Sequence, residues 1–556
     1  MAGGLMQLVA YGAQDVYLTG NPQITFWKVT YRRHTNFAME SIEQTFNGQA
    51  DFGRRVTCTI SRNGDLAYRT YLQLTLPEIG QSLSRTTTQT TDTLYARWLD
   101  FPGEQLISQV EVEIGGQRID RQYGDWMHIW NQLTLSKEQE RGYYKMIGNT
   151  TQLTYVCDPT FAAVDGPCSA DGVRQVCAPR KALPETTLYI PLQFWYCRNP
   201  GLALPLIALQ YHEVKINLDI RNIEECLWAV NSLDGRGSKI NEAYKQSLAA
   251  ASLFVDYIFL DTDERRRMAQ NPHEYLIEQL QFTGDESVGS SSNKIKLNLN
   301  HPCKELIWVV QPDANVDYCA SLVGGTALNT LLGAQPFNYT DALDALPNAV
   351  HAFGSRQNIQ SANGFITTSN AFEDMWANTI LANERINVTN SQGTVVSAGL
   401  GGFVAGSQTG SAAYSPDGTL NNEDSGVSDA GTFVLAETAL DMHCWGENPV
   451  VVAKLQLNGQ DRFSEREGTY FDLVQPFQHH TRAPDTGINV YSFALRPEEH
   501  QPSGTCNFSR IDNATLQLVL SNATVQGVAT AKVRVYAVNY NVLRIMSGMG
   551  GLAYSN

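Results

Sequence analysis

Two stretches of sequence share one pattern, VEVEIGGQRIDRQYGDWMHIW at residues 110–130 and AKLQLNGQDRFSEREGTYFDLV at residues 453–474. Each begins with apolar and polar residues in alternation, which is typical of a strand with one face in a core and the other in water. A glycine-containing turn follows, then a glutamine, an arginine and an aromatic stretch with the character of a short helix. The pattern predicts a β protein in which one unit occurs twice.

The similarity extends beyond these two stretches and keeps the same order along the chain. Matches in one order indicate two copies of one β domain. The further pairs are TLYIPLQFWYCRNPG (187–201) with INVYSFALRPEEHQPSG (488–504), YHEVKINLDI (211–220) with NATLQLVLS (513–521), and LFVDYIFLDTDERRRMA (253–269) with VRVYAVNYNVLRIMSG (533–548).

Long loops separate some of the expected strands and short turns separate others. With about eight strands per copy, that spacing favours a double-sheet jelly roll over a short-loop barrel or a propeller. The sequence therefore predicts an all-β fold, a double jelly roll built from two tandem eight-stranded jelly rolls. Helices are expected to be few and short, with one opening at residues 136–139 and another over residues 263–270.

The repeat sets the expected domain boundaries. An N-terminal arm at 1–24 precedes the first jelly roll at 25–265, and a linker at 266–272 leads to the second jelly roll at 273–546. A C-terminal tail covers 547–556.

The second copy carries a long insertion at about 311–449, where the first copy has only the gap 77–105. Gly, Ser, Ala, Asn and Thr are frequent in this insertion. A structureless loop of that length is implausible in a compact domain. We therefore expect the insertion to form strands of its own in an elaborated surface tower.

The composition excludes several classes of protein. The 556 residues include 56 acidic and 40 basic side chains, which gives a net charge of −16. A nucleic-acid-binding protein usually has the opposite sign because its affinity comes from neutralising phosphates, so direct contact with nucleic acid is disfavoured. No run reaches about 18 consecutive apolar residues, so no transmembrane helix is expected, and neither is a signal peptide.

Motifs for catalysis and metal binding are missing from the sequence, which has no G-x-S-x-G, no H-E-x-x-H, no Walker A motif and no EF-hand loop. The histidines are dispersed, and neighbouring strand residues such as His479 and His480 would point to opposite faces. We expect no enzymatic activity and no cofactor. A cupin-like metalloenzyme stays open as an alternative, which a search for bound metal would decide.

Ten cysteines are scattered along the chain without a C-x-x-C pair. In a reducing compartment, dispersed cysteines are most often small buried hydrophobic residues. Cys157, Cys168 and Cys177 are the closest cluster, in a loop rich in Gly, Pro and Asp, where a disulfide or a metal site is weakly indicated.

Three long motifs cover residues 3–46, 491–518 and 542–556. They begin GGLMQLVAYGAQDVYLTGNP, YSFALRPEEHQPSGTCNFSR and VLRIMSGMGGLAYSN. With these motifs the chain closely resembles the major capsid proteins of nucleocytoplasmic large DNA viruses, the group that includes chlorella viruses and iridoviruses. The resemblance covers both ends and, through the repeat, most of the chain.

The resemblance implies a structural protein with a double jelly roll. Three copies would form a homotrimer, a capsomer with a pseudo-sixfold outline, because each chain contributes two similar wedges. Neighbouring capsomers would tile the outer capsid shell of the virion over an internal membrane, with penton and minor capsid proteins as further partners. The N-terminal arm would face inward, the insertion would lie outside, and assembly would take place in the host cytoplasm.

Aromatic side chains are concentrated in and just after the arm, and they suit the apolar centre of a permanent interface. We expect them either to contact neighbouring chains at the capsomer base or to pack under the first jelly roll. The basic residues beside them would meet acidic partners or lipid headgroups, or form structural ion pairs. The candidates are Tyr11, Tyr17, Phe26, Trp27, Tyr31, Arg32, Arg33 and Phe37.

A structural corner is expected in QPSGTCNFSRID, residues 501–512. Pro502 and Gly504 indicate a tight turn. Arg510 and Asp512 are two residues apart, so on a strand both side chains would face the same side. We predict a hydrogen-bonded corner that fixes a loop between strands.

Two N-x-[ST] triplets in the insertion, at Asn338 and Asn387, are the candidates for exposed glycosylation, although no secretory signal accompanies them. The insertion also keeps an alternative function open. A lectin-like β-sandwich module would recognise host surface glycans through its exposed loops, alone or together with a role in the shell.

Overall fold

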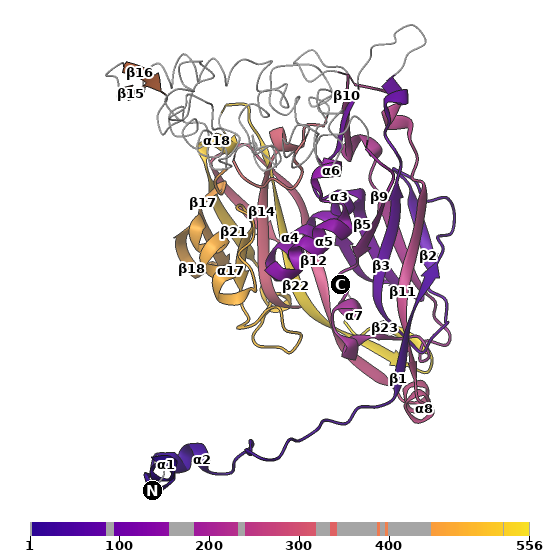
Figure 1. Cartoon of the computed structure of the whole chain (residues 1–556), viewed down its shortest axis with the longest axis vertical. Helices are drawn as coiled ribbons and strands as arrows, with labels where there is room; N and C mark the ends of the chain where they lie inside the picture. The colour runs from indigo at the N-terminus through magenta and orange to yellow at the C-terminus, as the bar shows by residue number, and fades with distance from the viewer. Residues whose placement is uncertain are drawn as a thin grey trace.

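The computed structural model describes residues 3–84, 94–154, 183–231, 239–318, 334–341, 386–389, 395–398, 446–525 and 527–554. Two β-rich bodies lie side by side, which we call the first half (residues 37–260) and the second half (residues 273–552). The first half is at the right of Figure 1 and the second at the left. An extended arm leads from the first half to the N-terminus.

The main strands of the first half are β1 (Phe37–Gln44), β2 (Arg55–Thr59), β3 (Leu66–Leu76), β5 (Ile107–Ile114), β6 (Gln117–Tyr123), β7 (Thr186–Pro191), β8 (Leu204–Pro205), β9 (Val214–Ile220) and β11 (Ala250–Leu260). One sheet has the order β1-β11-β3-β7, with β8 paired to β3, and the other has the order β2-β9-β5-β6. Both sheets contribute to one apolar core.

The main strands of the second half are β12 (His273–Val288), β13 (Ser292–Leu297), β14 (Pro302–Pro312), β17 (Val450–Leu457), β18 (Gln460–Glu467), β19 (Asn489–Ser492), β20 (Cys506–Asn507), β21 (Ala514–Leu520) and β22 (Ala531–Met546). Their sheets have the orders β12-β22-β14-β19, with β20 paired to β14, and β13-β21-β17-β18. Strand for strand, these orders are those of the first half. The duplication and the double jelly roll predicted from the sequence are confirmed.

The quoted stretches form equivalent hairpins because each ends its first strand in a turn that needs left-handed backbone. Gly115 and Gly116, with φ of 57° and 86°, join β5 to β6. Asn458 and Gly459, with φ of 50° and 80°, join β17 to β18. Two successive residues with positive φ match the right-handed twist of the flanking strands, which explains the preference for glycine and asparagine.

Helices are short, as expected. They are α1 (Gly3–Val9), α2 (Asp15–Thr19), α3 (Pro102–Leu106), α4 (Gly124–Thr134), α5 (Lys137–Ile147), α6 (Thr151–Thr154), α7 (Trp195–Arg198), α8 (Thr262–Gln270), the π-helix η11 (Tyr470–Val474), α17 (Gln475–His479) and α18 (Asn522–Val525). The two predicted helices are α5 and α8, although the side chain of the N-cap residue Ser136 makes no capping hydrogen bond.

Shorter strands complete the described chain. β4 (Tyr95–Trp98) pairs with β10 (Leu227–Val230), and β15 (Ile386–Thr389) pairs with β16 (Val395–Ala398) inside the expected insertion. Most of the insertion lies outside the described residues.

Near the ends of the two halves the chain differs from the expected segments. Residues 25–36 precede the first strand and continue the arm. Much of the expected linker is the end of α8. The expected tail contains β23 (Met549–Leu552), which pairs with β22 as a hairpin. The reason is local, since Ser547 and Gly548, with φ of 52° and 79°, form a turn that the alternating pattern does not reveal.

Candidate functional site

The two halves meet where α4 packs on the outward side of the β12-β22-β14-β19 sheet. Four side chains of α4 belong to one buried cluster with residues of β14, β19 and β22. Because β14 is covered on both sides, its centre LIWVV is continuously apolar rather than alternating. The helix residues are Trp126, Ile129, Trp130 and Leu133, and the strand residues are Ile307, Val309, Val490, Tyr536 and Val538.

Ion pairs border this apolar contact. Arg534 of β22 donates to Asp125 of α4 at 2.7 Å and to Asp285 at 3.0 Å. Arg198 of α7 pairs with Glu278 of β12 at 3.1 Å, and its guanidinium lies 4.2 Å from the centre of the Trp130 ring. These contacts fix how the first half sits on the second.

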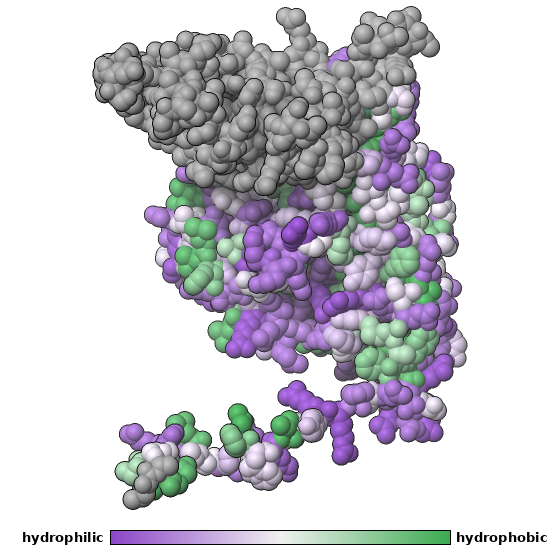
Figure 2. Space-filling view, in the orientation of Figure 1, coloured by the Kyte–Doolittle hydropathy of each residue, from purple (hydrophilic) through white to green (hydrophobic). Residues whose placement is uncertain are grey.

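In the second half, the helical segment that follows the β17–β18 hairpin is exposed. We call residues 470–479, formed by η11 and α17, the docking segment. Phe471 points into the core of the second half. Leu473, Val474 and Phe477 remain 53%, 39% and 86% exposed. Figure 2 shows hydrophobic side chains over this side of the second half.

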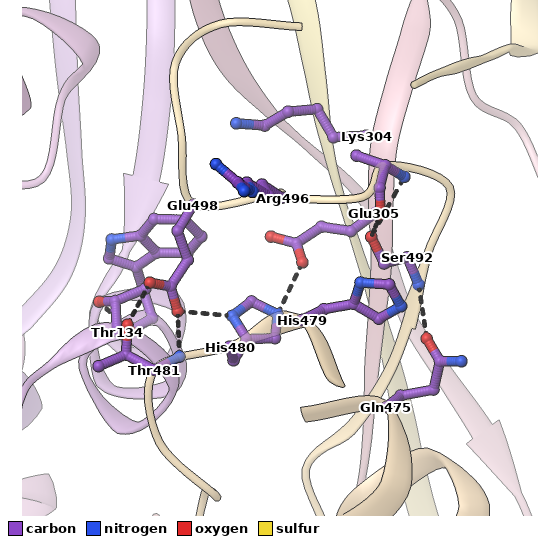
Figure 3. Close-up of polar contacts among 12 residues, drawn as sticks. Thr134, Lys304, Glu305, Gln475, His479, His480, Thr481, Ser492, Arg496 and Glu498 are labelled. Atoms are coloured by element: carbon purple, nitrogen blue, oxygen red, sulfur yellow. Dashed lines mark hydrogen bonds and ion pairs between the residues drawn. The ribbon is translucent and has the colours of Figure 1, made fainter. Parts of the chain in front are cut away.

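A buried histidine holds the end of the docking segment (Figure 3). His480 lies between two carboxylates, with Nε2 2.9 Å from Glu305 and Nδ1 3.0 Å from Glu498. Burial alone would lower the pKa of His480, but the charge of Glu305 and the hydrogen bonds to both carboxylates raise this pKa to about 9. The imidazole is therefore charged at neutral pH. Gln475 adds a second anchor by accepting a hydrogen bond from the backbone of Ser492.

The chain also has a buried group with the residue types of acid–base chemistry. His128 Nδ1 lies 2.7 Å from Glu104, and the Tyr143 hydroxyl donates to the same carboxylate. All three side chains are buried in the first half. No substrate reaches them there, so the group ties α3, α4 and α5 together.

Among the described residues, no group of three or more His, Cys, Asp or Glu is arranged to hold a metal ion. No helix in the described part of the chain is long and apolar enough to cross a membrane. Four of the cysteines described as free, Cys58, Cys197, Cys226 and Cys303, are buried, as expected for small hydrophobic residues. The cluster Cys157, Cys168 and Cys177 lies outside the described residues.

The arm residues singled out in the sequence do not pack under the first jelly roll. Every described residue of α1 and α2 is unburied, and the arm extends away from both halves (Figure 1). Arg32 and Arg33 are exposed as well. The aromatic side chains are all more than half exposed, namely Tyr11, Tyr17, Phe26, Trp27, Tyr31 and Phe37.

The corner around residues 501–512 is held by hydrogen bonds of side chains other than those singled out in the sequence. Arg510 ends a short 3-10 helix (Phe508–Arg510) rather than lying on a strand, and both Arg510 and Asp512 are exposed. No ion pair joins these two side chains in the described part of the chain. Ser503 Oγ accepts a hydrogen bond from the Arg496 backbone at 2.9 Å, and Asn507 accepts one from the Ser509 backbone at 3.0 Å. Gly504 allows the turn, since it has a φ of 146° and a Cβ there would lie 2.6 Å from the Phe493 carbonyl oxygen.

Asn338 is not the exposed site expected for glycosylation. It is half-buried, its amide nitrogen donates to Gln335 at 2.8 Å, and its amide oxygen accepts from the Thr340 backbone at 3.0 Å. The Asn-x-Thr triplet is thus an internal turn. Asn387 lies on β15, and its side chain is outside the described residues.

Comparisons with known proteins agree with this architecture. The family model for the large eukaryotic DNA virus major capsid protein matches residues 264–551, and the model for the major capsid protein N-terminus matches residues 25–261. The chain is 84% identical to the major capsid protein of Phaeocystis pouchetii virus, and each chain covers all of the other. The chain belongs to the major capsid protein family of large eukaryotic DNA viruses. It is a structural protein of the virion capsid shell and not an enzyme.

More distant relatives extend the similarity. The major capsid protein of Paramecium bursaria Chlorella virus 1 is 38% identical over the whole of both chains. The capsid model of that virus matches 96% of this chain and 100% of its own, at 31% identity and a TM-score of 0.58. The Faustovirus major capsid protein, at 12% identity and a TM-score of 0.59, shares the fold. These relatives support the shell role and not the lectin-like alternative.

The sequence pattern does not predict the docking segment or the helix-on-sheet contact between the halves. A signal was available, since both lie in the aromatic ends of the two quoted stretches. Periodicity shows which residues are apolar, but it does not show which of two neighbouring domains they face.

Proposed function

We propose that three copies of this chain form a closed trimeric capsomer, and that capsomers tile the outer shell. The observation that carries the proposal is the identical strand order of the two halves. Because each chain contributes two similar wedges, three chains have a sixfold outline. Head-to-tail contacts close into a ring of three when each contact rotates the next chain by a third of a turn. Weak contacts between capsomers gain strength because each capsomer makes many of them.

The exposed arm belongs, in this proposal, at the capsomer base. There Tyr17, Phe26 and Trp27 contact neighbouring chains or minor capsid proteins, and Arg32 and Arg33 face acidic partners or lipid headgroups of an internal membrane. Penton and minor capsid proteins are further partners, nucleic acid is not, and assembly takes place in the host cytoplasm. The insertion faces outward, with Asn387 its remaining candidate for glycosylation.

The proposed domains are the jelly rolls at 25–265 and 273–546. The two family models, which divide the chain between residues 261 and 264, support this division. Residues 25–36 would then act with the arm at 1–24 because they precede the first strand.

The mass of the purified protein in solution tests the trimer. With a chain mass of 61.5 kDa, size-exclusion chromatography with light scattering is expected to give about 185 kDa for a closed ring of three. A chain that stays monomeric at micromolar concentration, or forms a dimer or an open-ended series, contradicts the proposal.

A further inference from the structure

The docking segment carries an apolar surface that no described residue of the chain covers. Leu473 and Phe477 are more than half exposed, although Phe471 enters the core of the second half and Gln475 accepts a hydrogen bond from the Ser492 backbone. A fixed apolar ridge of this kind marks an interaction site rather than a loosely packed loop.

The repeat identifies the counterpart of this ridge. Gly124 at the start of α4 and Gly468 before the docking segment occupy the same position, because a Cβ on either would strike the carbonyl oxygen of the first residue of β5 or β17. Counting on from these glycines, Met127 and Phe471 both enter their own cores. The contact residues of α4, Trp126, Ile129, Trp130 and Leu133, then correspond to Tyr470, Leu473, Val474 and Phe477.

The sheet that α4 covers also has a counterpart. β3 and β14 have 11 residues each, and both pair near their start with a short strand, β8 or β20. Counting from there, Ile307 at the centre of the covered face corresponds to Tyr71. Ile307 is flanked by Tyr536 and Val490, and Tyr71 by Phe254 and Pro191.

This counterpart is open to solvent. We call the outward side of the β1-β11-β3-β7 sheet the free face, and define it by Tyr71, Gln73, Tyr189, Pro191 and Phe254. Tyr189 is 44% exposed and the others are half-buried. Neither Tyr71 nor Phe254 belongs to a core cluster of the described chain. Its aromatic rings suit the apolar ridge.

A largely buried ion pair distinguishes the two contacts, because both of its charged residues are replaced by uncharged ones at the corresponding positions of the other contact. Asp125 follows Gly124 in the covered contact and pairs with Arg534, which lies opposite Val309. Thr469 stands at the position that corresponds to Asp125. Ser252, which lies opposite Gln73, stands at the position that corresponds to Arg534. At these two positions the docking segment and the free face therefore bring no charge into the contact.

We propose that the docking segment of one chain packs on the free face of the next chain, repeating between chains the contact that α4 makes within the chain. The occupant is a second copy because the contact inside the chain leaves one helical segment and one sheet face unused. A head-to-tail contact of this type continues from copy to copy until the ring closes. The number of copies in the ring rests on the proposed trimer. The pairing of the docking segment with the free face does not depend on that number.

Two measurements test the contact on the full-length protein. Phe477→Glu places a charge in the contact and is expected to shift the mass from the assembled form to the monomer. Val528→Glu, at a fully exposed valine outside the docking segment, is the matched control and is expected to keep the wild-type mass. Because Phe477 is 86% exposed, the circular dichroism and thermal midpoint of the monomer should be unchanged in Phe477→Glu.

Photo-crosslinking then locates the partner surface. The variant Phe477→p-benzoylphenylalanine is expected to crosslink to peptides that contain Tyr71, Tyr189 or Phe254. Mixing isotopically light and heavy chains shows that the bond joins two chains. Crosslinks elsewhere, or a trimer that survives Phe477→Glu, overturn the contact and leave the trimer standing. Crosslinks to the free face within a ring of another size support the contact and contradict the trimer. A monomeric wild type overturns both.

Discussion

The two halves share one strand order but differ in what covers the same face of the same sheet. In the second half, α4 lies over Ile307 and Tyr536, whereas in the first half the corresponding Tyr71 and Phe254 are partly exposed. The covered contact uses two tryptophans and an ion pair, whereas its counterpart has Tyr470 and Val474 in place of the tryptophans and uncharged residues in place of the ion pair. The difference indicates that one contact forms as the chain folds. The surfaces of the other contact must remain exposed to solvent until a second chain binds.

The largest expected effect lies on the covered side of this comparison. Trp126 is 1% exposed, so Trp126→Ala leaves a large cavity and should lower the free energy of unfolding by about 3–5 kcal/mol. Phe477→Ala, in the equivalent helical segment, should change the stability of the monomer by less than about 0.5 kcal/mol. Chemical denaturation of the two variants at equal concentration measures both. Equal losses of free energy of unfolding would show that α4 and the docking segment are equally buried in the monomer.

A double-mutant cycle at the ion pair sharpens the comparison. Among the described residues, Arg534→Ser leaves Asp125 with Arg221, 3.5 Å away, as its remaining ion-pair partner. The change should cost about 3 kcal/mol because the carboxylate stays largely buried. The double variant with Asp125→Thr then has the same uncharged residue types as Ser252 and Thr469 in the other contact. Removing the unpaired carboxylate should restore more than half of the lost free energy of unfolding. The free energy of unfolding of each single and double variant checks this. Additive losses would contradict the correspondence between the two contacts.

The clamp at His480 gives a smaller, pH-dependent effect in the second half alone. The pKa of His480 is raised to about 9 in the fold, above its value of about 6.5 in the unfolded chain. The clamp's stabilisation is complete below pH 6.5 and is lost as the pH rises through 9. The thermal midpoint should therefore fall between about pH 7.5 and 9.5, and His480→Gln should flatten that fall. An unchanged slope in His480→Gln would exclude the clamp as its source.

The smallest expected effect is at the corner after β20. Arg510 is exposed and has no ion-pair partner in the described residues, so Arg510→Ala should change stability by less than about 0.5 kcal/mol. Trimer formation should also persist. Thermal unfolding and solution mass measure this directly. A loss of more than about 1 kcal/mol would restore the structural role first expected for this side chain.

Most of the fold could be predicted from the sequence because alternation and turn chemistry are local. Val110, Val112 and Ile114 alternate with glutamates, and the following glycines supply the positive φ of the turn. The local structure near the expected boundaries depends on other causes. Residues 25–36 carry apolar side chains without forming a strand, and β23 exists because a turn at Ser547 folds the chain back onto β22.

The candidate site was less accessible because it depends on contacts between distant segments. Leu133 and Phe477 have equivalent places in the repeat, yet one is buried by the other half and the other is exposed. The arm illustrates the same limit, since its aromatic residues signal an apolar contact but not its partner. Asn338 shows the converse case, where a polar triplet expected at the surface is a hydrogen-bonded turn.

A cryo-EM reconstruction of the purified oligomer tests the central claim most directly. The account predicts a ring of three chains in which residues 470–479 of each chain cover Tyr71, Tyr189 and Phe254 of the next. Density that leaves this sheet face open to solvent, or places another segment on it, would contradict the claim that one contact is used both within and between chains.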